Sequence, residues 1–518
     1  MTSFLNKLLE YYNITLEDYY SLIKDVNIYD VPNITDFDNG LITSNLLKSV
    51  LKDNKKILIY GDYDADGMLA TSILVYTFKK ISYKNYSYYL PSRYLDGYGL
   101  SIKAVEKAIK DKVELIITVD NGISQIDAVK LARENNIDVI ICDHHEIGNS
   151  LPDTKYIIHP IYSKYSDVIC SGAFTSYVLS ASILDLFDPY ILSLSSISTI
   201  SDMMKLVGYN RNIVRLGIKL MNENNFKQIN LLADNLKIDE KVIGSSISPK
   251  LNSVGRMMEN NKINFIVEFL TTNDEKNILK CFRYIQLLNE ERKKITNEYS
   301  VNLDDTEPCI IEYLDIKEGL LGLLANKYLN KFEKPVFFLT SDFNDDSILK
   351  GSARGKNNFS IVDCLKSVGD VLIAYGGHES AGGFSLYKKD LDLFKKRIFS
   401  YCNLNQESLN KQIEPSKFIS INESELLLEN YEILENFSPF GVGNEEPLFK
   451  LSNVPTNIFN FSKDGKHIIT KINKEAKLVY FNYNKDIFNK EFVNIYGNIN
   501  LNIFNNFKNI NFYIKKFE

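Results

Sequence analysis

The sequence predicts an α/β protein with a parallel-sheet domain, a second, smaller α/β domain and a C-terminal β-barrel. Between residues 51 and 258, short apolar segments alternate with amphipathic helical segments. This alternation is typical of parallel strands that are joined by crossover helices. Several of the apolar segments end in an acidic or His-containing turn. Because parallel sheets bind ligands beyond the carboxyl ends of their strands, these turns predict a functional site.

The composition is that of an ordinary folded protein. The chain has 518 residues, of which 45% are apolar and 24% charged. At about 150 residues per domain, it has room for three or four domains. It contains neither an apolar run of about 18 residues nor a secretory signal pattern, and its six cysteines are dispersed. We therefore expect a cytoplasmic monomer with no membrane association and reduced cysteines.

The pattern along the chain divides it into five segments. Residues 1–50 predict a helical lead-in, and residues 51–258 predict the first α/β domain. Residues 259–303 lack Pro and Gly, and most of them should form one long helix that connects two domains. Residues 304–410 predict the second α/β domain. Residues 411–518 are strand-like and predict a small β-barrel.

The first acidic turn places Asp62, Asp64 and Asp66 at every second position. A calcium-binding EF-hand loop also begins with this spacing, but it requires Glu at the position of Ile73 and a preceding helix. Here a strand precedes the turn. A solvated acidic turn is the simpler alternative, but it does not explain why further turns of the same sheet carry Asp or His.

The other candidate residues follow later apolar segments. Asp120 follows the second strand, and Asp143, His144 and His145 follow the third. Asp202 follows another apolar segment and in isolation would be interpreted as a helix cap. The chain has only five histidines, so an adjacent pair that follows an Asp at a strand end indicates function.

Clustered carboxylates repel one another unless cations neutralise them. Carboxylate oxygens with one or two imidazoles suit Mn²⁺ or Mg²⁺. Two such ions about 4 Å apart, bridged by a carboxylate, can hold both the attacking water and the leaving oxygen of a phosphoester. The pattern therefore predicts a phosphoesterase with two Mn²⁺ or Mg²⁺ ions.

Separate positive features indicate a phosphate-binding site. Arg93 and Arg256 lie near glycines, and Ser352 and Arg354 lie in a Gly-Ser-Ala-Arg segment. His378 follows two glycines. Guanidinium groups and backbone amides near glycine suit phosphate oxygens.

Together, these motifs resemble the DHH phosphoesterase superfamily, and within it the RecJ family of single-strand-specific 5′→3′ exonucleases. The resemblance extends from about residue 50 to the C-terminus. Small DHH enzymes lack the last of the motifs, which makes it discriminating. The motifs lie at residues 61–67, 119–122, 143–145, 200–206, 251–257, 351–354, 376–383 and 438–449.

The resemblance implies a set of metal ligands. Asp64 would hold one ion and Asp66 the other, with Asp120 as the bridge. His144 and Asp202 would complete the shell of the second ion. The C-terminal barrel would be an OB-fold, and the two α/β domains would be a DHH domain and a DHHA1 domain.

The resemblance also implies roles around the metals. Asp143 would orient the ligands, and His145 would contact the scissile phosphate or the reacting water. Five side chains would hold the strand, two at the backbone near the cleavage point and three at the 5′-terminal phosphate: Arg256 and His378, then Arg93, Ser352 and Arg354.

The chain departs from the family pattern at two places. Tyr60 stands where many DHH enzymes have a His ligand, so one metal should be held weakly. Residues 248–250 stand where the family often has an Arg that contacts the backbone. His159 has no role that the sequence indicates.

The expected function is hydrolysis of single-stranded DNA from the 5′ end to 5′-mononucleotides, in DNA repair and recombination. The family also implies single-strand-binding protein and a RecQ-type helicase as partners. Ten Lys against five acidic residues between 451 and 518, with many aromatics, suit single-strand binding. Two alternatives remain open: a DHH phosphodiesterase acting on oligoribonucleotides or cyclic dinucleotides, and a non-catalytic DNA-binding scaffold derived from a DHH enzyme.

Overall fold

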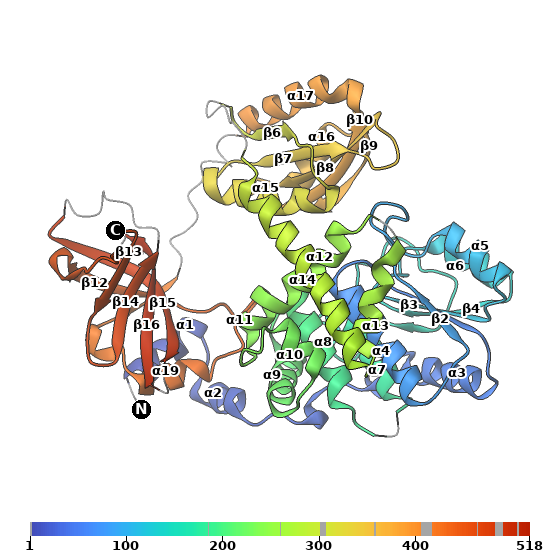
Figure 1. Cartoon of the computed structure of the whole chain (residues 1–518), viewed down its shortest axis with the longest axis horizontal. Helices are drawn as coiled ribbons and strands as arrows, with labels where there is room; N and C mark the ends of the chain where they lie inside the picture. Colours follow the sequence, from blue (N-terminus) through green and yellow to red (C-terminus); the bar gives the residue numbers. More distant parts are fainter. Residues whose placement is uncertain are drawn as a thin grey trace. The chain divides into compact units, whose positions relative to one another are not determined.

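The structure is a computed structural model in which the chain forms two compact units (Figure 1). The larger unit spans residues 28–412, and the smaller one joins residues 1–27 to residues 413–518. Each unit has its own hydrophobic core. The expected boundaries near residues 303 and 410 lie outside the described residues, which are 3–184, 186–259, 261–300, 307–356, 359–405, 417–463, 465–481, 490–504 and 507–518.

The first domain of the larger unit contains the predicted parallel sheet. Its strand order is β2-β1-β3-β4-β5, and every neighbouring pair is parallel. The central strands consist mainly of buried Ile, Val and Leu, as expected for strands that are covered on both faces. The strands are β1 (Ile57–Tyr60), β2 (Tyr86–Tyr89), β3 (Leu115–Val119), β4 (Asp138–Cys142) and β5 (Ile157–Ile158).

Helices cover both faces of this sheet (Figure 1). On one face, α5 and α6 contribute Val105, Ala108, Val129 and Ala132 to a core shared with the strands. On the other face, α4 is buried along nearly its whole length, because it packs against α7 and α8 as well as the sheet. The helices on the two faces are α3 (Gly40–Lys52), α4 (Ala65–Lys80), α5 (Ile102–Lys110), α6 (Ile126–Glu134) and α7 (Gly172–Ala181).

A set of helices then leads to the second domain. The long helix expected over 259–303 is divided: α13 ends at Thr271, and α14 begins at Glu275. Asp274 starts the new helix, because its side chain accepts a hydrogen bond from the Lys276 amide. The helices are α8 (Pro189–Ser201), α9 (Gly208–Glu223), α10 (Lys227–Leu232), α11 (Glu240–Val242), a π-helical turn (Ile243–Ile247), α12 (Ser248–Met257), α13 (Phe265–Thr271) and α14 (Glu275–Glu298).

The second domain is a mixed sheet of order β6-β7-β8-β10-β9. The pair β6–β7 is parallel and the others are antiparallel. Successive side chains of β7 alternate between two cores: Val336 and Phe338 pack with α15, whereas Phe337 and Leu339 pack with α16 and α17. The elements are β6 (Ile310–Tyr313), α15 (Glu318–Phe332), β7 (Val336–Ser341), β8 (Ile348–Arg354), α16 (Ile361–Ser367), β9 (Leu372–His378), β10 (Ala381–Tyr387) and α17 (Leu391–Leu404).

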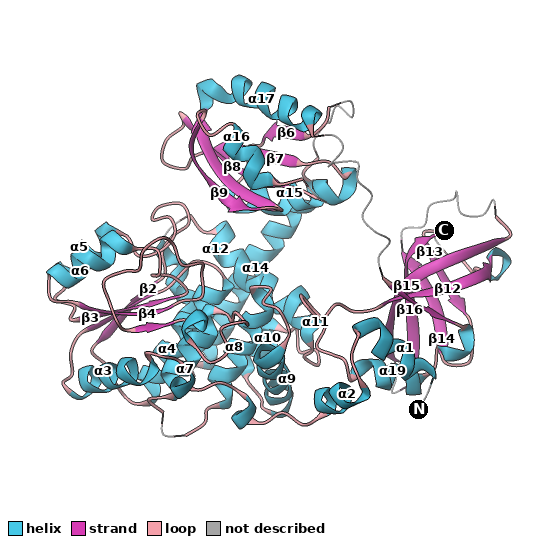
Figure 2. Ribbon diagram, turned by 180° about the vertical axis from the view of Figure 1, so that it is seen from behind, coloured by secondary structure: helices cyan, strands magenta, loops and turns pink. Residues whose placement is uncertain are grey.

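The smaller unit is the predicted β-rich domain. Its six strands have the order β11-β12-β15-β16-β14-β13 and enclose a core that includes Phe449, Ile495 and Phe512 (Figure 2). The strands are β11 (Phe418–Ile421), β12 (Leu448–Pro455), β13 (His467–Lys471), β14 (Ala476–Phe481), β15 (Phe492–Phe504) and β16 (Phe507–Phe517), and one helix, α19 (Leu428–Glu435), lies between β11 and β12.

Two N-terminal helices, α1 (Ser3–Tyr12) and α2 (Leu16–Ile23), complete the core of the smaller unit. Phe4 and Leu8 are buried in it, and the ring of Phe4 stacks on Phe449. Lys7 forms an ion pair with Glu425 at 2.8 Å. The start of the expected lead-in therefore belongs to the C-terminal unit, a pairing that no local sequence pattern indicates.

Candidate metal centre and phosphate-binding site

The acidic and His-containing turns meet at one edge of the parallel sheet. Strands β1, β3 and β4 are adjacent and parallel, so the turns that follow them lie together. Three groups of side chains there have ligand atoms within 4.8 Å of one another. The groups are Asp62 with Asp64 and Asp120, Asp120 with His144 and His145, and Asp66 with His144 and Asp202.

The first turn of α4 is anchored on two sides. Asp64 is the N-cap of this helix, and its side chain accepts a hydrogen bond from the Gly67 amide at 3.1 Å. Asp66 is buried and accepts hydrogen bonds from the amides of Gly172 and Ala173, both at 2.6 Å. These amides begin α7, and a helix N-terminus favours a nearby negative charge. The orientation of Asp66 is therefore fixed by the fold itself.

His144 lies among three carboxylates. Its Nε2 atom is 3.1 Å from Asp120 Oδ1, 3.5 Å from Asp202 Oδ2 and 3.6 Å from Asp66 Oδ2. Burial is the main cause that lowers the pKa of His144, which favours the neutral, ligating form of the imidazole. The structure thus brings together all five residues expected as metal ligands.

Asp120 occupies its position because of an unusual backbone conformation. Its φ is +61°, in the left-handed region that Asp and Asn tolerate better than most residues. The start of α7 approaches its side chain closely, because a Cβ at Gly172 would lie 2.6 Å from Asp120 Oδ1. Gly172 is therefore required for this packing. The sequence did not indicate that residue.

Asp62 also belongs to this site, although the sequence motifs assigned it no role. Asp62 is buried, and its Oδ1 atom has no hydrogen-bond partner among the described residues. The spacing of carboxylates at every second position was the available signal, but the resemblance assigned roles only to Asp64 and Asp66.

The charges of this cluster fit a divalent cation. Burial raises the pKa of Asp62, Asp120 and Asp202 well above the ordinary value, and neighbouring carboxylates raise it further. A partnerless buried carboxylate oxygen within a group of mutually repelling acids is an environment that a cation relieves. The acidic and His clusters could therefore hold divalent metal.

Tyr60 points away from these groups. It is 1% exposed, belongs to the core beneath α5 and packs on Tyr89 with ring centroids 5.6 Å apart. The position that supplies a His in many DHH enzymes contributes to the core here, and Asp62 is the additional carboxylate next to Asp64.

A second layer of contacts holds His145. Asp143 accepts hydrogen bonds from the Ile123 amide at 2.9 Å and from the His144 amide at 2.7 Å, and its Oδ1 lies 2.8 Å from Nδ1 of His145. Despite the opposing effect of burial, this hydrogen bond and charge pairing lower the pKa of Asp143 to about 2 and raise that of His145 to about 9. Asp143 therefore orients His145 and keeps it cationic.

His159 contacts the backbone of the same histidine, His145. It is fully buried, its Nε2 lies 2.9 Å from the backbone oxygen of His145, and its Nδ1 accepts a hydrogen bond from the Ile161 amide at 3.2 Å. Because Nδ1 accepts, Nε2 carries the proton and donates a hydrogen bond to the His145 carbonyl. This contact gives His159 a structural role that the sequence left unassigned.

Of the predicted phosphate-binding residues, Arg93 lies against the acidic turn, and Ser352 and Arg354 contact each other. The guanidinium of Arg93 lies 4.2 Å from the ring centroid of Tyr63, the residue between Asp62 and Asp64. Nη1 of Arg354 donates to Ser352 Oγ at 3.0 Å. Gly322 of α15 leaves room for this arginine, because a Cβ there would lie 2.6 Å from Arg354 Nη2.

Arg256 lies close to Arg93 and Arg354 and also to Arg292, which no sequence motif indicated. Burial, and then the positive charges of Arg93, Arg292 and Arg354, lower the pKa of Arg256 to about 10, whereas Asp64 acts in the opposite direction. Arg292 lies on α14, where its Nε and Nη2 donate to Asn289 at 3.2 and 2.8 Å. Four neighbouring guanidinium groups repel one another, so together they favour a bound anion.

The two remaining expected contacts are arranged differently. His378 ends β9 and pairs across the ladder with Ala381, which in turn pairs with Arg354, so it is two strands away from that arginine. Lys250 is buried, and its ammonium donates to the Leu232 carbonyl at 2.7 Å and to Asp234 at 2.8 Å. Lys250 therefore stabilises the fold and does not replace an Arg that contacts the backbone.

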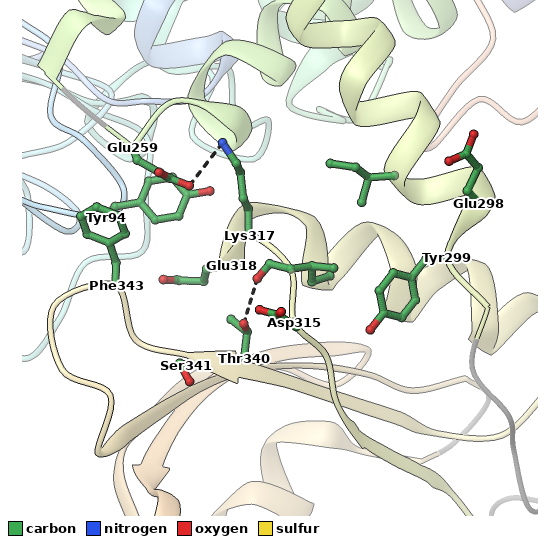
Figure 3. A pocket seen from close by; sticks show the side chains of 12 residues that line it. Tyr94, Glu259, Glu298, Tyr299, Asp315, Lys317, Glu318, Thr340, Ser341 and Phe343 are labelled. Atoms are coloured by element: carbon green, nitrogen blue, oxygen red, sulfur yellow. Dashed lines mark hydrogen bonds and ion pairs between the residues drawn. The ribbon is translucent and has the colours of Figure 1, made fainter.

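A cavity of about 620 Å³ lies between the end of α14 and the start of α15 (Figure 3). Glu259, Glu298, Asp315 and Glu318 line it, and Lys317 is paired with Glu259 at 3.2 Å. An acidic lining repels phosphate. The arginine group, rather than this cavity, is the place where the larger unit is suited to bind a polyanion.

Comparisons with known proteins agree with this arrangement. Residues 56–199 match the N-terminal domain of the DHH family, residues 306–404 the DHHA1 domain and residues 419–516 the RecJ OB domain. The fold and the site thus define a DHH-type protein with a DHHA1 domain. With the third match, the chain is similar to RecJ proteins in its C-terminal domain as well.

Curated relatives carry the name single-stranded-DNA-specific exonuclease RecJ. The protein of Bacillus subtilis is 29% identical over 487 residues, which are 89% of this chain and 60% of the relative. That of Thermus thermophilus is 28% identical, with 82% of this chain and 63% of the relative covered. The chain thus spans about 60% of the length of these relatives.

Solved structures show the same fold. A crystal structure of RecJ from Thermus thermophilus in complex with Mn²⁺ has a TM-score of 0.82 at 22% identity, covering 99% of this chain and 77% of that one. A structure of exonuclease RecJ bound to manganese has a TM-score of 0.61 at 25% identity, covering 74% of this chain and 96% of that one.

In the described part of this chain, no helix is both long and apolar enough to span a membrane.

Proposed function

We propose that this chain hydrolyses single-stranded DNA from the 5′ end and releases 5′-mononucleotides, in DNA repair and recombination. The observation that carries the proposal is the contact between the acidic cluster and the arginine group, because Arg93 stacks on the residue between Asp62 and Asp64. A cation-binding cluster beside an anion-binding one suits phosphodiester hydrolysis. The names of the curated relatives support the same substrate and reaction.

In this proposal, the acidic cluster would hold two Mn²⁺ or Mg²⁺ ions. Asp64 would hold one ion and Asp66 the other, and Asp120 would bridge them. His144 and Asp202 would complete the set of ligands around the second ion. Asp62 would be a further ligand for the first ion, to which Tyr60 would contribute none. When bound, such ions neutralise charge on the phosphoryl group and help to activate water.

The residues around this cluster orient the substrate. His145 is cationic and its side chain is 40% exposed, which suits contact with the scissile phosphate or the reacting water. Arg256 and His378 would hold the backbone near the cleavage point. Arg93, Ser352 and Arg354 would hold the 5′-terminal phosphate, and this contact would set the direction of degradation.

The smaller unit is proposed to grip the strand. Its surface exposes the rings of Phe481, Phe492 and Phe507, with exposed fractions of 54%, 50% and 74%. Each base stacked on an aromatic ring contributes about 1–3 kcal/mol with little sequence preference. Single-strand-binding protein and a RecQ-type helicase are the proposed partners, on the family resemblance alone.

The proposal is tested with 5′-labelled single strands, duplexes and oligoribonucleotides, each incubated with Mn²⁺ or Mg²⁺. We expect a labelled mononucleotide as the first product from single-stranded DNA, and slow or no cleavage of blunt duplex. Lack of cleavage of single-stranded DNA with either ion rejects the proposal. Cleavage of short oligoribonucleotides or cyclic dinucleotides alone would favour a small-substrate phosphodiesterase, and binding without cleavage would favour a scaffold.

Removal of residues 1–27 together with 413–518 should weaken activity on long strands and spare it on short ones. Both segments must be removed, because deleting the second alone exposes the apolar side chains of Phe4 and Leu8. Loss of about one stacked base corresponds to roughly a tenfold increase in KM for a long strand. The measurement compares KM for strands of about five and about fifty nucleotides, the shorter one spanning roughly the site of a single OB fold. An equal change for both lengths contradicts the assigned role.

A further inference from the structure

Tyr98 lies in the site but has no role in the mechanism above. It belongs to the loop between β2 and α5, and its hydroxyl oxygen lies 3.1 Å from both ring nitrogens of His145. The same hydroxyl lies 3.3 Å from the backbone oxygen of Asp120. The two rings meet edge to face, with centroids 5.4 Å apart. Tyr98 therefore contacts the proposed phosphate-binding histidine and the turn that carries the bridging carboxylate.

The loop is built to hold Tyr98 in this position. Gly97 and Gly99 flank it with φ of +75° and +77°, a region that favours glycine. A Cβ at Gly99 would lie 2.5 Å from the side-chain nitrogen of Gln125, whose Oε1 accepts a hydrogen bond from the Gly122 amide at 2.9 Å. The loop is thus fitted against the turn that follows β3, which also contains Asp120.

These contacts complement the one made by Asp143. Asp143 binds the Nδ1 side of His145, and a ring that is held at a single nitrogen can still swing about that hydrogen bond. The hydroxyl of Tyr98 can donate to the Asp120 carbonyl, and its oxygen, which lies 3.1 Å from both ring nitrogens, contacts the face of the His145 ring. Because Asp143 holds Nδ1 and the Tyr98 hydroxyl contacts the ring face, the imidazole can no longer swing about the single hydrogen bond to Asp143.

We propose that Tyr98 is a positioning residue whose hydroxyl fixes the imidazole plane of His145 for contact with the scissile phosphate. This inference rests on the proposed function, because it takes the phosphate contact of His145 from there. Tyr98 acts through His145 and does not hold the strand, so its loss should affect turnover rather than substrate affinity.

The test is Tyr98→Phe, which removes the hydroxyl and keeps the ring. We expect kcat on single-stranded DNA to fall about tenfold, the scale of one hydrogen bond, with KM within about twofold of the wild type. Tyr284→Phe is the matched control, because Tyr284 is similarly exposed, at 43% against 42%, and should retain both constants. An unchanged kcat overturns the proposal, and so does a raised KM with kcat unchanged, which would make Tyr98 a strand-binding residue.

A second measurement does not depend on activity. In protein labelled with ¹⁵N-histidine, the ring-nitrogen signals of His145 are assigned by their loss in His145→Gln. We expect these signals to shift or broaden in Tyr98→Phe and to stay unchanged in Tyr284→Phe. Unchanged signals in Tyr98→Phe overturn the proposal. If the wild type cleaves no single-stranded DNA, the proposed function fails, whereas this spectrum still decides whether Tyr98 positions His145.

Discussion

Asp120→Asn is expected to lower the rate of strand hydrolysis by about 10³-fold, comparable with the loss of a group that stabilises charge in the transition state. Asp120 belongs to two of the three candidate ligand groups, and its Oδ1 lies 3.1 Å from His144. Asn has nearly the same shape and tolerates the φ of +61° that this position requires. The substitution therefore removes a charge and preserves the turn. Single-turnover cleavage of a 5′-labelled strand measures the effect.

The same substitution should stabilise the metal-free protein. Burial and neighbouring carboxylates raise the pKa of Asp120, so its ionised form opposes folding in the absence of cations, at pH values above the ordinary pKa of an Asp. We expect a higher Tm for Asp120→Asn in EDTA, and a smaller gain in Tm on adding Mn²⁺ than in the wild type. Asp127→Asn, an exposed substitution on α6, serves as the control. Cleavage within about tenfold of the wild type would refute the assignment, because the loss of one such group costs about 10²–10³ in rate.

Arg354→Ala is expected to abolish the preference for a 5′-phosphate. Charge-assisted hydrogen bonds contribute about 1.5–3 kcal/mol, so the loss on 5′-phosphorylated strands should be roughly 10–150-fold. Strands with a 5′-hydroxyl should be cleaved at nearly the wild-type rate, because they lack the group that this arginine binds. The measurement is kcat/KM for both kinds of strand.

Arg283→Ala provides the matched control for this experiment. Arg283 is exposed on α14, outside the arginine group, and its loss should leave both strands unaffected. An equal decrease of kcat/KM on phosphorylated and hydroxylated strands would contradict the role of Arg354 in 5′-phosphate binding. It would indicate instead a general contact with the backbone.

Much of the architecture could be predicted because it is written in local patterns. Parallel strands appear as short apolar runs between helical segments, and a turn after such a run must lie at the carboxyl edge of the sheet. For this reason Asp64, Asp66, Asp120 and His144 could be expected together before any coordinates were known. The division between α13 and α14 was missed because Asp274 is an N-cap within a strongly helical composition.

Residues whose contacts are with residues far away in the sequence could not be predicted from local patterns. Arg292 lies in a charged helical stretch, where it is indistinguishable from a solvated side chain until α14 packs against α12. Tyr98 is one of 32 tyrosines, and the two glycines around it indicate only a turn. Asp62 was recognised as part of the acidic turn but was assigned no role, because the family pattern assigned roles only to Asp64 and Asp66 of that turn.

The packing of α1 on the C-terminal strands has a consequence for biosynthesis. Lys7 and its partner Glu425 are separated by 418 residues, so the ribosome makes the first part of this core long before the last. At about 5–20 residues per second, the interval is roughly 20–80 s. Throughout that time Phe4 and Leu8 lack the C-terminal side chains of their core, such as Phe449, while the larger unit can already fold. The smaller unit therefore closes only after the whole of the larger unit has been synthesised.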